Sequence, residues 1–141
     1  MAGVADPFAK VKAATDAHRA RHGCGAYPYD NGPLLAALAA AANARRILEL
    51  GTALGYTALS FASGAPDSTV DTVERDPEHV RLARDNIAAA ALDHRITVHE
   101  GDFATICRHW IPVTTSPSLT VTRRCRRCIS RWASFCAPAV F

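Results

Sequence analysis

The chain has 141 residues, of which 49% are hydrophobic and 21% are charged, and its formal net charge is +3. This composition is typical of a soluble globular protein and argues against wholesale disorder, collagen-like repeats or a coiled coil. No apolar run reaches the ~18 residues that a membrane span needs, and the N-terminus lacks the apolar core of a secretory signal. We therefore expect one domain, in the cytoplasm.

The net charge is an average over two unlike parts of the chain. Residues 1–103 hold ten basic side chains and all thirteen acidic ones, whereas residues 104–141 hold six arginines, four of the five cysteines and no acid. Such a shift in composition indicates a boundary near residue 103. We expect three segments: a helical and loop segment at 1–31, an α/β segment at 32–103, and an atypical basic Cys/Arg-rich tail at 104–141.

Hydrophobic periodicity and turn residues predict alternating helices and strands. The helices expected in chain order cover Ala9–His22, Pro33 to about Asn43, Tyr56–Ser63, and a segment that begins at Asp76-Pro77-Glu78. The strands expected between them cover Arg46–Leu50, Ser68–Val73 and His94–Val98. In the last helix, apolar residues at helical spacing should share one face, namely Val80, Ala83, Ile87 and Ala91.

The alternation of strands and helices predicts an α/β fold with a doubly wound parallel sheet. Three strands alone would leave one apolar strand without a neighbour, and an unpaired strand is a template for aggregation. We therefore expect a marginally stable protein.

A glycine-containing turn follows the first strand in the run Glu49-Leu-Gly-Thr-Ala-Leu-Gly-Tyr-Thr57. Glycines at this position let the backbone turn tightly and approach a ligand, and the following helix offers unpaired N–H groups at its start. In open α/β sheets, ligands bind at this carboxyl edge. A turn without any ligand would explain the loop about as well.

Acidic residues stand at or near the ends of all three expected strands, at Glu49, Glu74 and Asp102. An acid about 20 residues beyond the glycine turn can accept hydrogen bonds from ribose hydroxyls, which suits Glu74. Asp102 could reach an adenine amino group. The alternatives are a surface charge at Glu74 and a helix cap at Asp102. The three acids together favour a nucleoside site over any one of them alone.

Residues 32–106 resemble the cofactor half of class I S-adenosylmethionine-dependent methyltransferases with a Rossmann-like sheet. The resemblance is greatest to the O-methyltransferases related to catechol and caffeoyl-CoA O-methyltransferase. It is carried by the Glu49–Thr57 run and by Val73-Glu-Arg-Asp-Pro-Glu78, with weaker support from Gly101-Asp-Phe103. A dinucleotide fingerprint would need a glycine where Ala53 stands.

The resemblance implies a role for each matching residue. Glu49 and Gly51 would hold the methionyl end of S-adenosylmethionine, in a pocket lined by Ala53, Gly55, Tyr56 and Thr57. Glu74 would bind the ribose, and Asp102 with Phe103 would border the adenine. The segment Tyr27–Gly32 lies where the family closes over the cofactor, but it matches poorly.

The resemblance also implies methyl transfer to the hydroxyl of a small-molecule acceptor. We expect no membrane partner, do not favour a nucleic-acid partner, and allow a homodimer. Many members of the family use a divalent metal such as Mg²⁺, held first by an aspartate that ends the fourth strand. No acid follows Asp102 in this chain, so the family's metal ligands are absent and no catalytic residue can be assigned. The alternative is a non-catalytic adenosyl-ligand-binding or interaction protein with a basic tail.

A slip of the reading frame near Thr105 or Ile106 would explain the tail. When the last base of each codon is read with the first two of the next, Trp110-Ile111 must give aspartate and His109-Trp110 must give leucine. Suitable wobble bases turn residues 106–121 into a strand that contains the missing aspartate. Other readings are a zinc or redox site at Cys125 and Cys128, or a nucleic-acid patch at Arg123–Arg127.

Histidines and one cysteine occur in the first 103 residues without a recognisable motif. We expect His18, His22, His79 and His94 to be surface residues. Cys24 is expected to be a free, reduced thiol.

Overall fold

The structure is a computed structural model, and it describes residues 5–103, 105–106 and 118–122. The helices are α1 (Ala9–His22), α2 (Gly32–Ala41), α3 (Tyr56–Gly64) and α4 (Pro77–Ala89). The strands are β1 (Arg46–Leu50), β2 (Thr69–Glu74), β3 (Ile96–Glu100) and β4 (Ser118–Thr122). None of the helices in the described part of the chain is long and apolar enough to cross a membrane.

The four strands form one parallel sheet in the order β3-β2-β1-β4. The predicted α/β class with a parallel sheet is therefore confirmed. The expectation that an apolar strand lacks a neighbour is wrong for β1. Strand β4 pairs with β1 along its whole length, from Arg46 opposite Ser118 to Leu50 opposite Thr122. This pairing satisfies the backbone groups that a three-stranded sheet would leave open on that side of β1. Among the described residues, the edge strands of the sheet are therefore β3 and β4.

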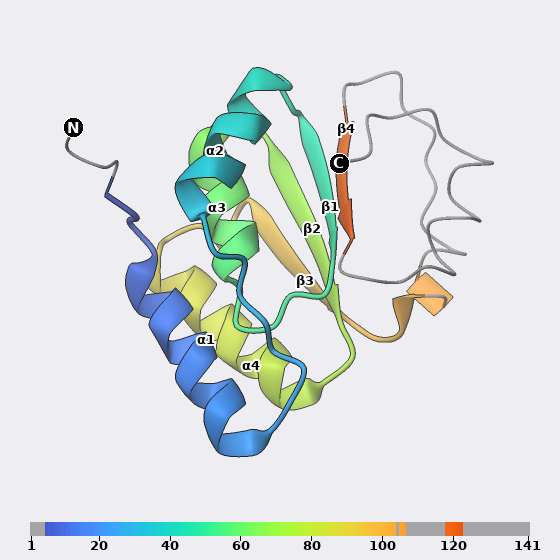
Figure 1. Cartoon of the computed structure of the whole chain (residues 1–141). Helices are drawn as coiled ribbons and strands as arrows, with labels where there is room; N and C mark the ends of the chain where they lie inside the picture. The colour runs from blue at the N-terminus through green and yellow to red at the C-terminus, as the bar shows by residue number, and fades with distance from the viewer. Residues whose placement is uncertain (1–4, 104, 107–117, 123–141) are drawn as a thin grey trace.

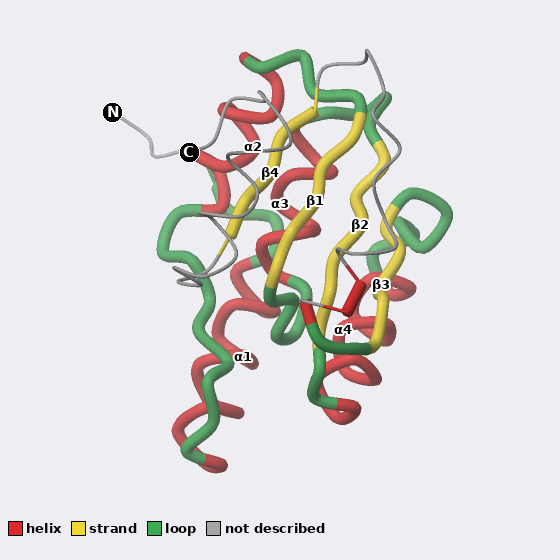
Figure 2. Tube along the Cα trace, turned by 90° about the vertical axis from the view of Figure 1, so that its right-hand side faces the viewer, coloured by secondary structure: helices red, strands yellow, loops and turns green. Residues whose placement is uncertain are grey.

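All four helices lie on the same side of the sheet, as the two perpendicular views show (Figures 1 and 2). Strand residues that point to this side, such as Ile47, Val70 and Val98, form the core with Leu59 of α3 and Ile87 of α4. This core packs the helices against the sheet and so fixes the positions from which the loops at the carboxyl edge of the strands begin.

Helices α2 and α3 approach each other more closely than any side chain would allow at their contact. A Cβ atom placed on Gly64 would lie 2.0 Å from the carbonyl oxygen of Ala36 and 2.5 Å from its Cα. The absence of a side chain at Gly64 therefore sets the distance between the two helices.

The helix start at Asp76 is confirmed, because Asp76 Oδ1 accepts hydrogen bonds from the backbone N–H groups of Glu78 (2.9 Å) and His79 (3.4 Å). Several bounds differ from expectation by one or two residues, and two of the differences have a clear cause. Strand β3 begins at Ile96 instead of His94, because the Leu92 carbonyl accepts from the N–H groups of Arg95 and Ile96 and keeps this segment in a turn. Ala91 lies beyond α4, exposed and with a φ of 55°, so it does not share the apolar face.

Candidate functional site

The order of the strands reverses at β1. The chain proceeds from β1 to β2 and β3 on one side, whereas β4 lies on the other side of β1. Ligands of open α/β sheets bind where the strand order reverses, at the carboxyl edge of the strands. In this sheet that point is the end of β1, where the glycine-containing turn begins.

The turn after β1 takes three left-handed backbone conformations within five residues. The φ angles are 101° at Gly51, 49° at Ala53 and 93° at Gly55. Gly51 N–H donates to the carbonyl of Val73 (2.9 Å), and Gly55 N–H donates to that of Thr52 (3.0 Å). Left-handed conformations favour glycine, so Ala53 is held in this turn by its surroundings.

Glu74 holds the turn in this conformation. The side chain is buried at the end of β2, and its Oε2 accepts a hydrogen bond from Ala53 N–H (2.9 Å). Its Oε1 accepts from the N–H groups of Arg75 (2.9 Å) and Asp76 (3.1 Å). A carboxylate offers about four lone-pair positions, so these bonds leave about one free for a ligand hydroxyl.

Glu49 lies beneath the turn, buried in β1 with 1% of its surface exposed. Thr72 Oγ1 donates to Glu49 Oε2 (2.7 Å) and lies 2.6 Å from Thr52 Oγ1. Because the Thr72 proton is directed at Glu49, Thr52 must donate to Thr72. The result is an ordered chain of two hydroxyls from the turn to a buried carboxylate.

Tyr56 and Thr57 begin α3 and are both buried. The Tyr56 hydroxyl donates to Asp6 Oδ2 (2.5 Å) and accepts from Gly32 N–H (2.9 Å). Burial and the Asp6 carboxylate raise the pKa of Tyr56 to about 12. Tyr56 thus links α3 to Asp6, which lies ahead of α1, and to Gly32, the first residue of α2. Thr57 Oγ1, in contrast, is buried without a hydrogen-bond partner among the described residues.

Asp102 and Phe103 follow β3 on the same edge. Gly101 N–H donates to the Glu74 carbonyl (2.8 Å), which places this segment beside the end of β2. Asp102 is exposed, and its carbonyl accepts from the N–H groups of Thr105 (3.1 Å) and Ile106 (3.0 Å). Phe103 is half-buried. Asp102 thus begins a helical turn through its backbone carbonyl, which is consistent with the helix-cap alternative.

Sequence reasoning missed two supports of the turn. Asn86 of α4 donates from Nδ2 to the Leu54 carbonyl (2.9 Å), and Ala26 packs with Ala53 and Leu54. Asn86 belongs to no recognisable motif. An amide on the half-buried side of α4 could nevertheless have indicated a hydrogen bond to a neighbouring segment. Ala26 shows that the segment after α1 reaches the turn.

The expectation of a surface position is wrong for His79, which is 5% exposed. It lies in the first turn of α4, whose start is held against the core by Val80, and its Nδ1 is 4.0 Å from Glu74 Oε2. His18 of α1 is near, with the two ring centroids 5.1 Å apart. Burial, followed by the charges of His22 and His79, lowers the pKa of His18. Cys24 is a free thiol, as expected.

The fold and the site define a class of protein, and comparison with known proteins gives the family. The chain belongs to the O-methyltransferase family, whose model matches residues 9–114. A proposed O-methyltransferase from Klebsiella pneumoniae is similar in structure, with a TM-score of 0.76, 29% identity, and coverage of 93% of this chain and 60% of that one. Cofactor-bound Rv0187 from MTB has a TM-score of 0.68 and 31% identity, covering 86% and 55% of the two chains.

The name of one curated relative gives a different methyl acceptor, a tRNA adenine. The tRNA1(Val) (adenine(37)-N6)-methyltransferase of Citrobacter koseri is 41% identical over 87 residues, which are 61% of this chain and 34% of that protein. The chain thus spans about a third of the length of this relative. The O-methyltransferase TomG of Streptomyces achromogenes, solved in complex with SAM, shares the fold with a TM-score of 0.77 at 23% identity, covering 95% of this chain and 60% of that one.

Proposed function

We propose that this chain binds S-adenosylmethionine and S-adenosylhomocysteine through the turn after β1 and the acids around it. The observation that carries the proposal is the Glu74 carboxylate, which fixes the turn through Ala53 and keeps lone-pair capacity for a ligand. Thr57 Oγ1 has no hydrogen-bond partner among the described residues, which fits a polar group supplied by a ligand. The solved relatives with SAM or SAH bound support the same assignment.

Each predicted residue has a role in this proposal. Glu74 accepts a ribose hydroxyl, and Asp102 and Phe103 border the adenine. Glu49 and Gly51 serve the methionyl end, Ala53 and Gly55 shape the turn, and Thr57 offers its hydroxyl. Tyr56 supports the pocket and does not bind the ligand through its hydroxyl, because Asp6 and Gly32 already form hydrogen bonds with that hydroxyl.

Calorimetric titration of the full chain with S-adenosylhomocysteine tests this assignment, with NAD⁺ as the competing class of ligand. We expect S-adenosylhomocysteine to bind with 1:1 stoichiometry and NAD⁺ not to bind. The variant Glu74→Gln should weaken binding, whereas Glu78→Gln, which removes an equal charge from an exposed side chain of α4, should not. Binding of S-adenosylhomocysteine that is equal in both variants would remove Glu74 from the site.

The acceptor proposed first is the hydroxyl of a small molecule, which the O-methyltransferase family match supports. When bound, S-adenosylmethionine supplies a methyl group on a sulfonium, and the protein's part is to align the acceptor with it. The second candidate is N6 of a tRNA adenine, favoured by the 41% identity with the Citrobacter koseri enzyme. Methyl transfer to a catechol and to unmodified tRNA, measured side by side with the protein whose reading frame is restored near codon 106, separates the two.

We further propose that the frame slips near residue 105 and that this chain has little or no activity of its own. No acid follows Asp102, so the family's metal ligands are missing. The predicted zinc, redox or nucleic-acid features of the tail at residues 123–128 lie outside the described residues. Sequencing the locus is the direct test, and a frame that stops soon after residue 106 would contradict the slip.

A further inference from the structure

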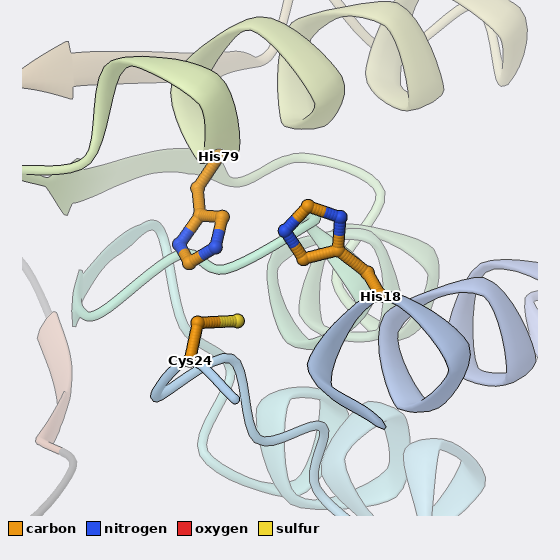
Figure 3. A group of neighbouring side chains, drawn as sticks. All are labelled: His18, Cys24 and His79. Carbon is orange, nitrogen blue, oxygen red and sulfur yellow. The ribbon is translucent and has the colours of Figure 1, made fainter. Parts of the chain in front are cut away.

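Three side chains with good metal-binding atoms meet beside the proposed cofactor site. His18 comes from the last turns of α1, Cys24 from the segment after it, and His79 from the first turn of α4 (Figure 3). One ligand atom from each lies within 4.8 Å of the other two. In Figure 3 a ring nitrogen of each histidine and the Cys24 sulfur are turned toward a shared space.

The positions of the two imidazole rings fit a common metal. A nitrogen lies about 1.1 Å from its ring centre and about 2.05 Å from zinc, so two rings at a tetrahedral angle should have centres about 5.2 Å apart. The observed separation of the His18 and His79 centroids is 5.1 Å. The sulfur and nitrogen ligands of one zinc ion are about 3.6 Å apart, so the 4.8 Å limit leaves about 1 Å for side chains to close.

A second observation points to a missing ligand. His79 Nε2 is buried and has no hydrogen-bond partner among the residues that the structure describes, although Asp76 Oδ2 lies 4.0 Å away. A buried polar atom without a partner normally costs free energy, so an occupant that accepts its lone pair is favoured. On the other side of the ring, Nδ1 is 4.0 Å from Glu74 Oε2. Histidine ligands of metals usually donate a hydrogen bond from their second ring nitrogen to a carboxylate or carbonyl, and here Nδ1 and Oε2 would have to approach by about 1 Å to form one.

We propose that His18, Cys24 and His79 bind a divalent transition metal of the zinc class, with water in the fourth position. Two imidazoles and one thiolate suit zinc and cobalt better than magnesium or calcium, which prefer oxygen. The metal would join α1 to the start of α4. This site is separate from the family's aspartate-based metal ligands and does not depend on methyl transfer.

Cobalt reports on the site directly, because a thiolate ligand gives a charge-transfer band and tetrahedral geometry gives strong visible bands. The full chain, stripped with a chelator and kept reduced, is titrated with Co²⁺, and Zn²⁺ is then used to displace it. We expect one strong site per chain with both spectral features. A spectrum without the thiolate band would overturn the proposal.

The variants Cys24→Ser and His79→Gln identify the ligands. Loss of a residue that merely supports a ligand typically costs about 10–100-fold in metal affinity, so loss of a ligand should cost about 100-fold or more. His94→Gln changes an exposed histidine and is the matched control. Four cysteines lie at residues 107–136, so unchanged Co²⁺ binding by Cys24→Ser would place the metal there and refute the assignment. Circular dichroism of the metal-free variants separates loss of a ligand from loss of folding.

Discussion

Replacement of Glu74 should lower stability and ligand binding together, because one carboxylate serves both. It accepts three backbone N–H groups at 2.9, 2.9 and 3.1 Å. Hydrogen bonds to a charged group contribute roughly 1.5–3 kcal/mol each, but they are not additive and water can reach part of this site. We therefore expect Glu74→Ala to lower the free energy of unfolding by about 2–4 kcal/mol.

Glu74→Gln should be milder. The amide oxygen keeps the place of one carboxylate oxygen, while the NH₂ group opposes at least one backbone donor. A flip that leaves the oxygen facing Arg75 and Asp76 loses only the Ala53 bond, which costs about 1–2 kcal/mol. The turn after β1, more than α4, should then loosen.

Urea unfolding, followed by circular dichroism and intrinsic fluorescence, measures the first effect, and calorimetry with S-adenosylhomocysteine measures the second. Glu78→Gln is the control, because that side chain is exposed and pairs with Arg81 on the surface of α4. Affinity should fall by about 5–150-fold in Glu74→Ala, which corresponds to roughly 1–3 kcal/mol. A urea midpoint that moves no further in Glu74→Ala than in Glu78→Gln would refute the reasoning.

Three more outcomes are expected. Ultraviolet titration should show a tyrosine step near pH 12 that Tyr56→Phe removes. Since this pKa is raised on folding, its contribution to stability is full below pH 10 and should vanish between pH 10 and about 12, as alkaline unfolding would reveal. Gly64→Ala should lower the free energy of unfolding by about 3 kcal/mol or more, because its Cβ meets the Ala36 backbone, whereas Gly55→Ala carries only backbone strain of about 1–2 kcal/mol. Thermal melts that rank these two variants the other way would contradict the helix contact. Restoring the frame near codon 106 should give a soluble, longer protein that transfers methyl groups to a hydroxylated acceptor, and an early stop would end that account.

Local signals in the sequence were enough to place most elements. The cap, proline and acid at residues 76–78 fixed the start of α4, and the apolar run before Gly51 fixed β1. Strand β4 could not be predicted in the same way. Ser118–Thr122 lies in a segment of changed composition, and its pairing with β1 is a long-range contact without a local signature.

The sequence predicts which residues belong to the candidate site but not the hydrogen bonds between them. Spacing brought Glu74 to the edge beside Gly51, yet its hydrogen bond to Ala53 depends on how the turn closes. His79 looked like a surface residue because it follows an exposed cap, and only the packing of α4 against α1 and the core buries it. Burial of this kind is decided by neighbours distant in the chain, which single-sequence periodicity does not report.

The two threonine hydroxyls between the turn and Glu49 extend the electrostatic influence of a carboxylate that no ligand needs to touch. Each O–H dipole points its positive end inward, from Thr52 to Thr72 and from Thr72 to Glu49. The negative end of the series is therefore the Thr52 oxygen, at the turn after β1. Aligned dipoles in a low-dielectric interior reinforce one another, so part of the negative potential of Glu49 is carried to the buried Thr52 at the start of the turn. A positively charged ligand group would be attracted there without desolvating Glu49 itself.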